Sequence, residues 1–476
     1  MKNKQTKIIC TISNKHCEPE FISELAEAGM NLARLNTAHM QPEDAQCVVD
    51  NIRSISQQIG ILIDTKGPEV RIAELPDPLD RQAGDEVRVA SDHLPENGFR
   101  VNYLEFVNEV PVGERILIDD GEVELEVTAK TADELLCRVC NDGTIKNAKS
   151  INVPGVGLEL PALTERDVSF IQWAVEAEVD FIAHSFVRNR DDVMAVQSIL
   201  NMHKSPIKII AKIENREGVR NLESILDAAH GVMIARGDLG IEIPAEEVPI
   251  IQKKMIRACI SRRKPVITAT QMLHSMIDNP RATRAEVSDV ANAVYDGTDA
   301  LMLSGETAYG KYPVESVQTM VRIAKSVEAQ KSMGQGDHSP EQIEPKADKP
   351  HFHLAKSAVF MANALQAKAI ITSTKSGDTA QICAAHRGQS PIYAFSASAR
   401  TVRELSLTYG VRAEQIQVPD TTDALVKTAL ERLLAQDCFK MDDLIVFVGG
   451  GHIYSAHTNF LQVDTPSTLL KENDLQ

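Results

Sequence analysis

The feature that most constrains the fold is a repeated alternation of short apolar segments with amphipathic helical patterns. The apolar segments predict strands because they are short and are bounded by polar residues, Gly or Pro. Eight such segments occupy residues 6–12, 30–36, 61–66, 180–186, 207–214, 231–236, 265–270 and 299–305. Between most of these segments, apolar residues recur at the i, i+3, i+4 spacing of a helix, and one such pattern runs continuously over 216–229. Eight successive βα units predict a (β/α)₈ barrel of the α/β class.

The helical rhythm stops inside the third unit and again near the C-terminus. Short alternating strands punctuated by Gly and Asp predict a small β-barrel lid domain at 69–159, inserted between barrel segments 1–68 and 160–335. A polar stretch rich in Pro and Lys predicts a linker at 336–352. Strand–helix alternation then resumes, so we expect a doubly wound α/β domain at 353–476.

The net charge limits the possible binding partners, and the cysteine usage indicates the cellular compartment. The net charge of −17 argues against nucleic acid or an anionic membrane as the main partner. The N-terminal apolar run is too short for a signal peptide, and no run reaches the roughly 20 apolar residues of a membrane span. Eight scattered cysteines suit a reducing compartment. We therefore expect a cytoplasmic protein.

Polar side chains gather where the predicted barrel strands end. In such barrels the carboxyl ends of the strands build the active site. A rim salt bridge explains any one polar residue there, but clusters at seven strand ends indicate a shared site. The clusters are Arg34 and Asn36; Asp64, Thr65 and Lys66; His184 and Ser185; Lys212 and Glu214; Asp238; Thr270 and Gln271; and Ser304 and Glu306.

The residue types at these positions indicate a reaction class. Glu214 and Asp238, on adjacent strands, form a minimal site for Mg²⁺ or Mn²⁺. Arg34, Arg71 and Lys212 add cationic donors suited to phosphate or carboxylate. Cations with a divalent metal and few bases favour phosphoryl transfer over hydrolysis. The sequence contains neither a P-loop motif nor a protein-kinase Gly-rich loop.

Several longer motifs resemble the pyruvate kinase family over nearly the whole chain. They include GMNLARLN, LIDTKGPEVR, KIENREGV, MIARGDLGIEIP, TATQML and LSGETAYGKYPVE, in this order. The resemblance implies transfer of the phosphoryl group of phosphoenolpyruvate to ADP, giving pyruvate and ATP, by a protein that is usually a homotetramer. It implies that the inserted lid domain closes over the site.

The resemblance also implies roles for individual residues. Glu214 and Asp238 would hold Mg²⁺, while Lys212, Arg34 and Thr270 would be catalytic. The other implied sets are a substrate-binding set of Arg34, Ala235, Arg236, Gly237, Asp238 and Thr270; a nucleotide-binding set of Arg71, Lys149, His39 and Asn36; a K⁺-binding set of Asn36, Asp64 and Thr65; and an effector loop of Thr374, Lys375, Ser376, Gly377 and Thr379.

Some positions depart from the family pattern. Ala38 stands where the family has a Ser that ligates K⁺, and Ala offers no side-chain oxygen. Glu69 accompanies K⁺ dependence in the family, so we expect retained K⁺ activation with reduced affinity, completed by water, Thr37 or a carbonyl. His184 takes an often apolar position and is expected to be a hydrogen-bonded packing residue. Asp378 should repel a phosphate, and the closing GGGHIYSAHTNF segment is also atypical.

Two other readings share part of this pattern. A metal-dependent enolpyruvate aldolase or lyase would use the same two carboxylates, but it would need neither the lid nor the combination of Lys212 with Thr270. A non-catalytic, sensor-like member of the family would fit Ala38, although the residues proposed for transfer are all present.

Overall fold

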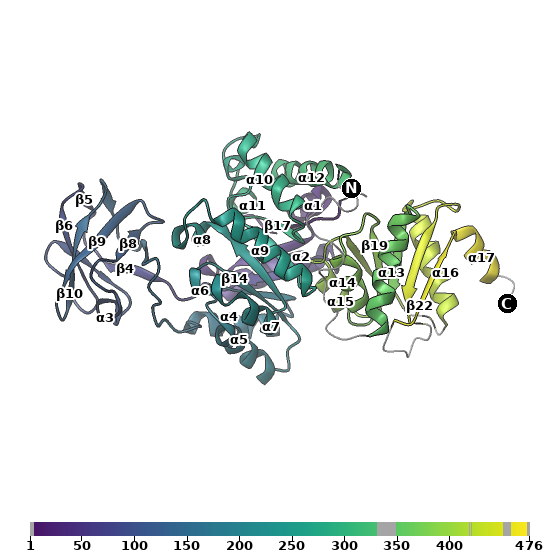
Figure 1. Cartoon of the computed structure of the whole chain (residues 1–476), viewed down its shortest axis with the longest axis horizontal. Coiled ribbons are helices and arrows are strands. Elements are labelled where there is room, and N and C mark those ends of the chain that lie inside the picture. The colour runs from purple at the N-terminus through teal and green to yellow at the C-terminus, as the bar shows by residue number, and fades with distance from the viewer. Residues whose placement is uncertain (1–3, 331–348, 418, 420, 451–457, 474–476) are drawn as a thin grey trace.

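A computed structural model describes residues 4–330, 349–417, 419, 421–450 and 458–473. Three bodies follow one another along the long axis of the molecule, with the lid domain at one end, the (β/α)₈ barrel in the middle and the C-terminal domain at the other end (Figure 1). Most of the predicted linker, 336–348, lies outside the described residues. No helix in the described part of the chain is long and apolar enough to cross a membrane.

Eight parallel strands form the closed barrel, which confirms the predicted fold class. They follow the order β1-β17-β16-β15-β14-β13-β3-β2 around the barrel. Their apolar side chains are buried on both faces because helices cover the outside. The strands are β1 (Lys7–Thr11), β2 (Leu32–Asn36), β3 (Gly60–Asp64), β13 (Phe181–His184), β14 (Lys208–Ile213), β15 (Gly231–Ala235), β16 (Val266–Ala269) and β17 (Ala300–Leu303).

The helices around the barrel follow the predicted apolar spacing with one exception. The pattern at 216–229 forms two helices, not one, because Asn221 leaves helical geometry and its side chain donates to the Arg188 carbonyl at 2.9 Å. The helices are α1 (Pro19–Ala28), η1 (Thr37–His39), α2 (Pro42–Ile55), α4 (Glu165–Glu176), α5 (Arg190–Met202), α6 (Arg216–Arg220), α7 (Leu222–Ala228), α8 (Arg236–Glu242), α9 (Val248–Ser261), η2 (His274–Ile277), α10 (Arg284–Tyr295), α11 (Gly305–Ala308) and α12 (Pro313–Gln330).

The inserted segment folds around an apolar core of its own. Seven of its strands close in the order β10-β6-β7-β4-β12-β8-β9, and β5 pairs with β11 as a separate ribbon. Its elements are β4 (Val70–Glu74), β5 (Leu79–Arg81), β6 (Glu86–Ala90), β7 (Gly98–Val101), α3 (Phe106–Glu109), β8 (Arg115–Ile118), β9 (Val123–Lys130), β10 (Glu134–Val139), β11 (Gly143–Ile145) and β12 (Ser150–Asn152).

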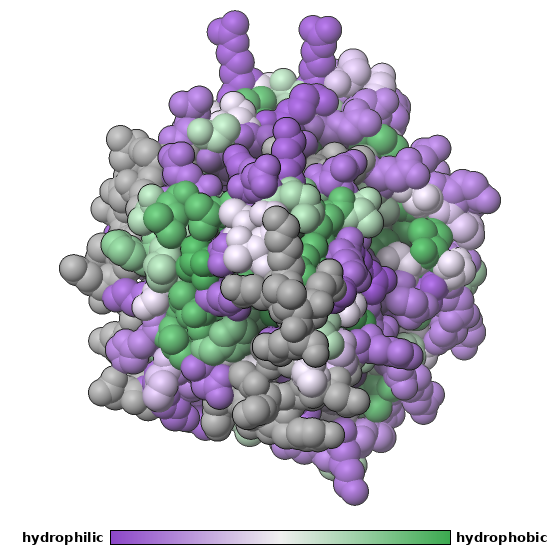
Figure 2. Space-filling model, turned by 90° about the vertical axis from the view of Figure 1, so that its right-hand side faces the viewer, coloured by the Kyte–Doolittle hydropathy of each residue, from purple (hydrophilic) through white to green (hydrophobic). Residues whose placement is uncertain are grey.

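The C-terminal domain has a five-stranded sheet in the order β20-β19-β18-β21-β22, with β22 antiparallel. Two separate apolar clusters lie on the sheet, as a doubly wound domain requires. Viewed from this end, apolar surface is surrounded by polar side chains (Figure 2). The elements are α13 (Pro350–Ala364), β18 (Ala369–Ser373), α14 (Asp378–Ala385), β19 (Ile392–Ser396), α15 (Ala399–Leu405), β20 (Val411–Gln415), α16 (Thr422–Ala435), β21 (Ile445–Gly449), β22 (Phe460–Asp464) and α17 (Pro466–Asn473).

The turn after α15 seals the N-terminal end of the barrel. Leu407 is fully buried in the cluster of apolar side chains that fills the barrel interior. Beside it, Arg403 Nε lies 2.7 Å from Asp180 Oδ1, and Arg387 contacts Asp299 at 2.8 Å. The C-terminal domain is therefore part of the barrel's closure, at the end opposite the predicted active site.

Candidate active site

Asp64, at the end of β3, collects donors from three other strands. Arg34 of β2 donates Nε to Asp64 Oδ2 at 2.7 Å, and Lys212 of β14 approaches Asp64 Oδ1 at 3.0 Å. Ser185, just after β13, donates its hydroxyl to the same carboxylate at 3.2 Å. Burial alone would raise the pKa of Asp64, but Arg34 and Lys212 outweigh it and lower that pKa.

Lys212 lies at the centre of these contacts. Its ammonium is 2.9 Å from Glu214 Oε1 and donates to Ser185 Oγ at 2.7 Å, in addition to its contact with Asp64. Burial would lower the pKa of Lys212, but the carboxylates of Asp64 and Glu214 raise it above its ordinary value. Lys212 is therefore a fixed positive charge on the site's inner wall, not a base.

Glu214 and Asp238 lie against each other. Burial raises the pKa of Glu214, Lys212 lowers it, and the neighbouring Asp238 raises it further; the net direction is upward. The pKa of Asp238 is also raised, first by burial. The backbone N–H of Phe186 donates to Glu214 Oε2 at 2.6 Å and orients its carboxylate. Two buried carboxylates whose charges disfavour each other form a donor set that suits a divalent cation.

The ends of β15 and β16 are joined at Thr270. The Gly237 N–H donates to Thr270 Oγ1 at 2.8 Å, and that hydroxyl donates to the Ala269 carbonyl at 2.7 Å. Thr270 has a left-handed backbone, with φ 65°. The Arg236 side chain turns away to Asp289 at 2.7 Å, so the predicted substrate-binding segment from Ala235 to Asp238 presents backbone groups and the Asp238 carboxylate.

The predicted K⁺ ligands lie together where β2 and β3 end, next to Arg34. Asn36 and Asp64 are register partners of β2 and β3. The Asn36 side chain accepts the Ala38 N–H at 3.2 Å, and the Thr65 carbonyl accepts the Ser185 hydroxyl at 2.7 Å. Thr37 is buried and donates its hydroxyl to the Asp64 carbonyl at 2.8 Å, which places a further oxygen beside the position that Ala38 leaves apolar.

Two of the predicted nucleotide-binding residues lie side by side in the lid. Arg71 of β4 pairs in register with Ser150 of β12, the residue after Lys149. Arg71 makes a two-pronged contact with Glu69, at 2.8 and 3.0 Å, and Lys149 contacts Asp119. His39, the third of these residues, is exposed at the end of η1 on the barrel side.

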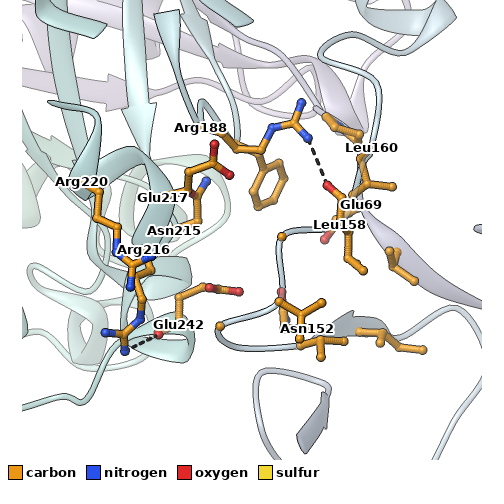
Figure 3. A pocket seen from close by; sticks show the side chains of 18 residues that line it. Glu69, Asn152, Leu158, Leu160, Arg188, Asn215, Arg216, Glu217, Arg220 and Glu242 are labelled. Atoms are coloured by element: carbon orange, nitrogen blue, oxygen red, sulfur yellow. Dashed lines mark hydrogen bonds between the residues drawn. The ribbon is translucent and has the colours of Figure 1, made fainter. Parts of the chain in front are cut away.

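A hinge pocket of about 280 Å³ separates the lid strands from the barrel loops that follow β13, β14 and β15. Apolar side chains of the returning lid segment form one wall, and charged side chains of the barrel form the other (Figure 3). Arg188 bridges the two walls by donating to the Leu158 carbonyl at 3.2 Å. Glu242 lines the barrel wall, and burial raises its pKa to about 7.

The predicted effector loop connects β18 to α14. Gly377 has φ 90°, and its N–H donates to Thr374 Oγ1 at 2.9 Å. Lys375 and Ser376 are exposed, whereas the Thr379 hydroxyl contacts that of Thr458 at 2.7 Å. Asp378 is exposed beside Arg263 of the barrel and raises the pKa of that guanidinium, which burial lowers. The centre of the GGGHIYSAHTNF segment, 451–457, lies outside the described residues.

His184 lacks the full hydrogen bonding that the sequence predicted among the described residues, and the supporting residue Asp167 was not predicted. His184 is buried as expected, but its Nε2 has no hydrogen-bond partner among the described residues. Its Nδ1 is 3.4 Å from Thr65 Oγ1. Asp167 accepts the backbone N–H groups of Lys66 at 2.9 Å and Gly67 at 3.3 Å. A capping position in TERD, at the start of α4, was the available signal for Asp167.

Comparison with known proteins agrees with this architecture. The family model described as "Pyruvate kinase, barrel domain" matches residues 3–317, and "Pyruvate kinase, alpha/beta domain" matches residues 353–464. A relative named pyruvate kinase from Borreliella burgdorferi is 47% identical over the full length of both chains. Relatives of the same name from Bacillus licheniformis and Geobacillus stearothermophilus are 44% and 42% identical, over 97% and 99% of this chain and 80% and 81% of their own. The chain belongs to the pyruvate kinase family.

Proposed function

We propose that this phosphotransferase moves the phosphoryl group of phosphoenolpyruvate to ADP and releases pyruvate and ATP. The observation that carries the proposal is Lys212, held between Asp64 at 3.0 Å and Glu214 at 2.9 Å, with Asp238 adjacent. A buried ammonium beside two carboxylates that suit a divalent cation gives a site that can stabilise anionic oxygens on a transferring phosphoryl group.

Glu214 and Asp238 would hold Mg²⁺ or Mn²⁺. Burial raises both pKa values; the Asp238 charge adds to the rise at Glu214, and the Asp120 and Glu69 charges add to the rise at Asp238, which fits a site in which a cation balances the carboxylates. The metal would supply positive charge to the phosphate and enolate oxygens. Binding it requires both carboxyl groups to be deprotonated.

The protein's own side chains would perform the remaining work. Arg34, held in place by Asp64, would bind the phosphate, and Lys212 would stabilise charge on the phosphoryl group and on the forming enolate. The backbone from Ala235 to Asp238 would bind the substrate carboxylate. Thr270, whose hydroxyl already contacts Gly237, would belong to the route by which a proton reaches the enolate.

The nucleotide would bind between the lid and the barrel. Arg71 lies on β4 and Lys149 directly precedes the adjacent strand β12, so rotation of the lid would carry both toward the barrel together. Asn36 and His39 would contact the nucleotide from the barrel side. Closure would exclude water that could otherwise accept the phosphoryl group.

A monovalent cation would bind at Asn36, Asp64 and Thr65. Thr37 supports retention of this site, because its oxygen lies beside the Asp64 carbonyl where Ala38 contributes none. We therefore propose K⁺ activation of reduced affinity.

The proposal also covers the oligomeric state, the cellular compartment and the effector site of the protein. Exposed large apolar residues occur on all three bodies, among them Leu104 on the lid, Tyr309 on the barrel and Phe360 on α13. We propose that the protein is a homotetramer, a state that native mass spectrometry measures. The enzyme would work in the cytoplasm. A monophosphorylated sugar or nucleotide would bind at Thr374, Lys375, Ser376, Gly377 and Thr379.

One assay separates the proposed reaction from its alternatives. Pyruvate is measured from phosphoenolpyruvate with and without ADP, in the presence of Mg²⁺ and K⁺. ADP-dependent pyruvate with equal ATP supports the proposal. An aldolase or lyase would not depend on ADP, and a sensor would form no pyruvate in either case. Repeating the assay with a panel of sugar phosphates tests the effector loop.

A further inference from the structure

Two thiols meet on the surface of the barrel, outside the proposed active site. Cys17 lies in the loop between β1 and α1, and Cys47 lies on α2. Cys47 is exposed, Cys17 is half-buried, and both are free thiols. They come from separate segments, so their proximity is produced by the packing of α1 against α2 and not by neighbouring positions in the sequence.

One side chain holds this pair together. The Asn51 amide nitrogen, one turn beyond Cys47 on α2, donates to the Cys17 carbonyl at 2.8 Å and reaches Cys47 Sγ at 3.9 Å. The Cys17 Sγ lies 3.6 Å from the Asn14 carbonyl on its other side. Burial raises the pKa of Cys17, and the adjacent Cys47 thiol, in hydrogen-bonding contact with it, raises that pKa further.

The other six cysteines differ in this respect. Four are buried in the three domain cores, where burial raises the pKa of each thiol: Cys10, Cys137, Cys259 and Cys383. Cys140 is exposed, but Cys137, its nearest cysteine in sequence, points into the lid core. Cys438 is half-buried in the C-terminal domain. The pair of Cys17 and Cys47 therefore combines access from solvent with a second thiol in contact.

We propose that Cys17 and Cys47 form a reversible oxidation site that reacts with a peroxide to give an intramolecular disulfide. Cys47, the exposed thiol, attacks the peroxide O–O bond as its thiolate and becomes a sulfenic acid, and the leaving hydroxide takes a proton to give water. Cys17 then attacks the Cys47 sulfur and expels a second water as the S–S bond forms. Two thiols and one hydrogen peroxide thus become one disulfide and two waters.

The disulfide would fix the loop that precedes α1. That loop is already tied to α11, which follows the neighbouring strand β17, since Ser13 donates its hydroxyl to the Ala308 carbonyl at 2.8 Å. Joining Cys17 to α2 would also hold the segment from Asn36 to His39, which lies between β2 and α2. The consequence for turnover, a changed KM for ADP, rests on the proposed function; formation of the disulfide does not.

The test uses the full chain, reduced and then treated with one equivalent of hydrogen peroxide. Free thiols are blocked, and peptides are analysed by mass spectrometry without reduction. Trypsin cleaves after Arg34, between the two cysteines, so the disulfide appears as a linked pair of peptides. We expect loss of two free thiols, a Cys17–Cys47 link and full reversal by dithiothreitol.

Three variants keep the proposal falsifiable. Cys17→Ser should leave Cys47 as a sulfenic or sulfinic acid with no link, Cys47→Ser should leave Cys17 largely unreacted, and Cys140→Ser should behave as the wild type does. Oxidation of Cys47 in the wild type while Cys17 stays free would overturn the proposal, as would links that join other cysteines. A link without any change in the KM for ADP would overturn only the proposed consequence. Absence of turnover in the reduced protein would instead contradict the proposed function.

Discussion

At the residue scale, one buried carboxylate, Asp64, orders the site. It holds Arg34 and Lys212, the two cations proposed to face the phosphate, and it accepts Ser185 as well. Breaking a buried ion pair typically costs about 3–5 kcal/mol, because a charge is left without a partner. These side chains are therefore fixed before substrate arrives, which is the preorganisation that electrostatic catalysis requires.

Ala38 gives the first prediction. Ala38→Ser restores a hydroxyl next to the predicted K⁺ ligands, where Asn36 already caps the Ala38 N–H. One added oxygen ligand worth about 1 kcal/mol should lower the K⁺ concentration for half-maximal activity roughly fivefold. Steady-state rates against KCl, at ionic strength held constant with tetramethylammonium chloride, measure this. An unchanged K⁺ dependence in the variant would contradict the assigned cation site.

Lys7 gives a prediction about pH. Burial lowers its pKa to about 7, and Lys4 and Arg412 lower it further, while Glu328 and Asp299 oppose them. The unfolded chain, with a pKa of 10.5, binds more protons than the folded chain between these values, so stability should rise with pH across that window. Unfolding by urea at several pH values should show Lys7→Met losing part of this rise. Lys4, with its pKa lowered to about 8, would retain a smaller part.

Some site residues could be read from the sequence and others could not. Arg34, Glu214 and Asp238 were predictable because they end apolar strands, and the barrel topology brings such ends together. The pairing of Asp64 with both Arg34 and Lys212 was not, since side-chain partners depend on the stagger between strands. The environment of His184 Nε2, which finds no hydrogen-bond partner within the described part of the chain, likewise depends on packing that the sequence pattern does not show.

At the element scale, the connection between barrel and lid passes through Gly67, the position proposed as the hinge of lid closure. It has φ 72°, and a Cβ there would lie 2.7 Å from the Phe186 ring and 2.9 Å from Ser185 Cβ. The backbone strain and the contact fall on the same residue, between β3, which ends at Asp64, and β4, which contains Arg71. The connection at Gly67 therefore joins the lid to the end of β3, where Asp64 contacts Ser185 and Lys212.

Gly67→Ala and Gly84→Ala make a matched pair. Both glycines have positive φ, but a Cβ at Gly84 would meet nothing within 4 Å. Each substitution should cost about 1 kcal/mol of stability through backbone strain. Only Gly67→Ala should also reduce kcat, by tenfold or more, because Phe186 and Ser185 must move. Equal rates for the two variants would show that the hinge contact has no part in turnover.

The sequence predicted the strands that are buried on both faces, but it did not predict the strand β22 at the edge of the C-terminal sheet. The eight barrel strands are buried on both faces, so their apolar runs were unambiguous. The strand β22, half-buried throughout, carries a weak pattern and was not predicted. The break between α6 and α7 was not predicted, because the apolar spacing continues across it, although Asn221 is a weaker helix former than Arg220 and Leu222.

At the scale of the whole molecule, the C-terminal domain completes the barrel by inserting Leu407 into it. Leu407→Ala should destabilise the protein by about 2–5 kcal/mol, because the interior around it cannot collapse fully. Thermal unfolding followed by calorimetry should show barrel and C-terminal domain losing stability together. Leu444→Ala, at a site 37% exposed in the same domain, should have little effect. Loss confined to the C-terminal domain would contradict the shared closure.

The whole-molecule organisation followed from the sequence only in outline. Three bodies were expected from changes in periodicity, and the three bodies are present. How the C-terminal domain packs against the barrel was not predictable, because it depends on ion pairs such as Arg403 with Asp180 and Arg387 with Asp299, which join residues far apart in the chain.

The buried ammonium of Lys212 is proposed to stabilise phosphoryl transfer. The direct measurement is the rate of pyruvate and ATP formation by Lys212→Met, compared with the wild type and with the exposed control Lys254→Met. We predict that Lys212→Met loses at least a thousandfold in kcat, about 4 kcal/mol of transition-state stabilisation, while Lys254→Met stays within twofold of the wild type. A folded Lys212→Met protein that still forms both products near the wild-type rate would contradict the account.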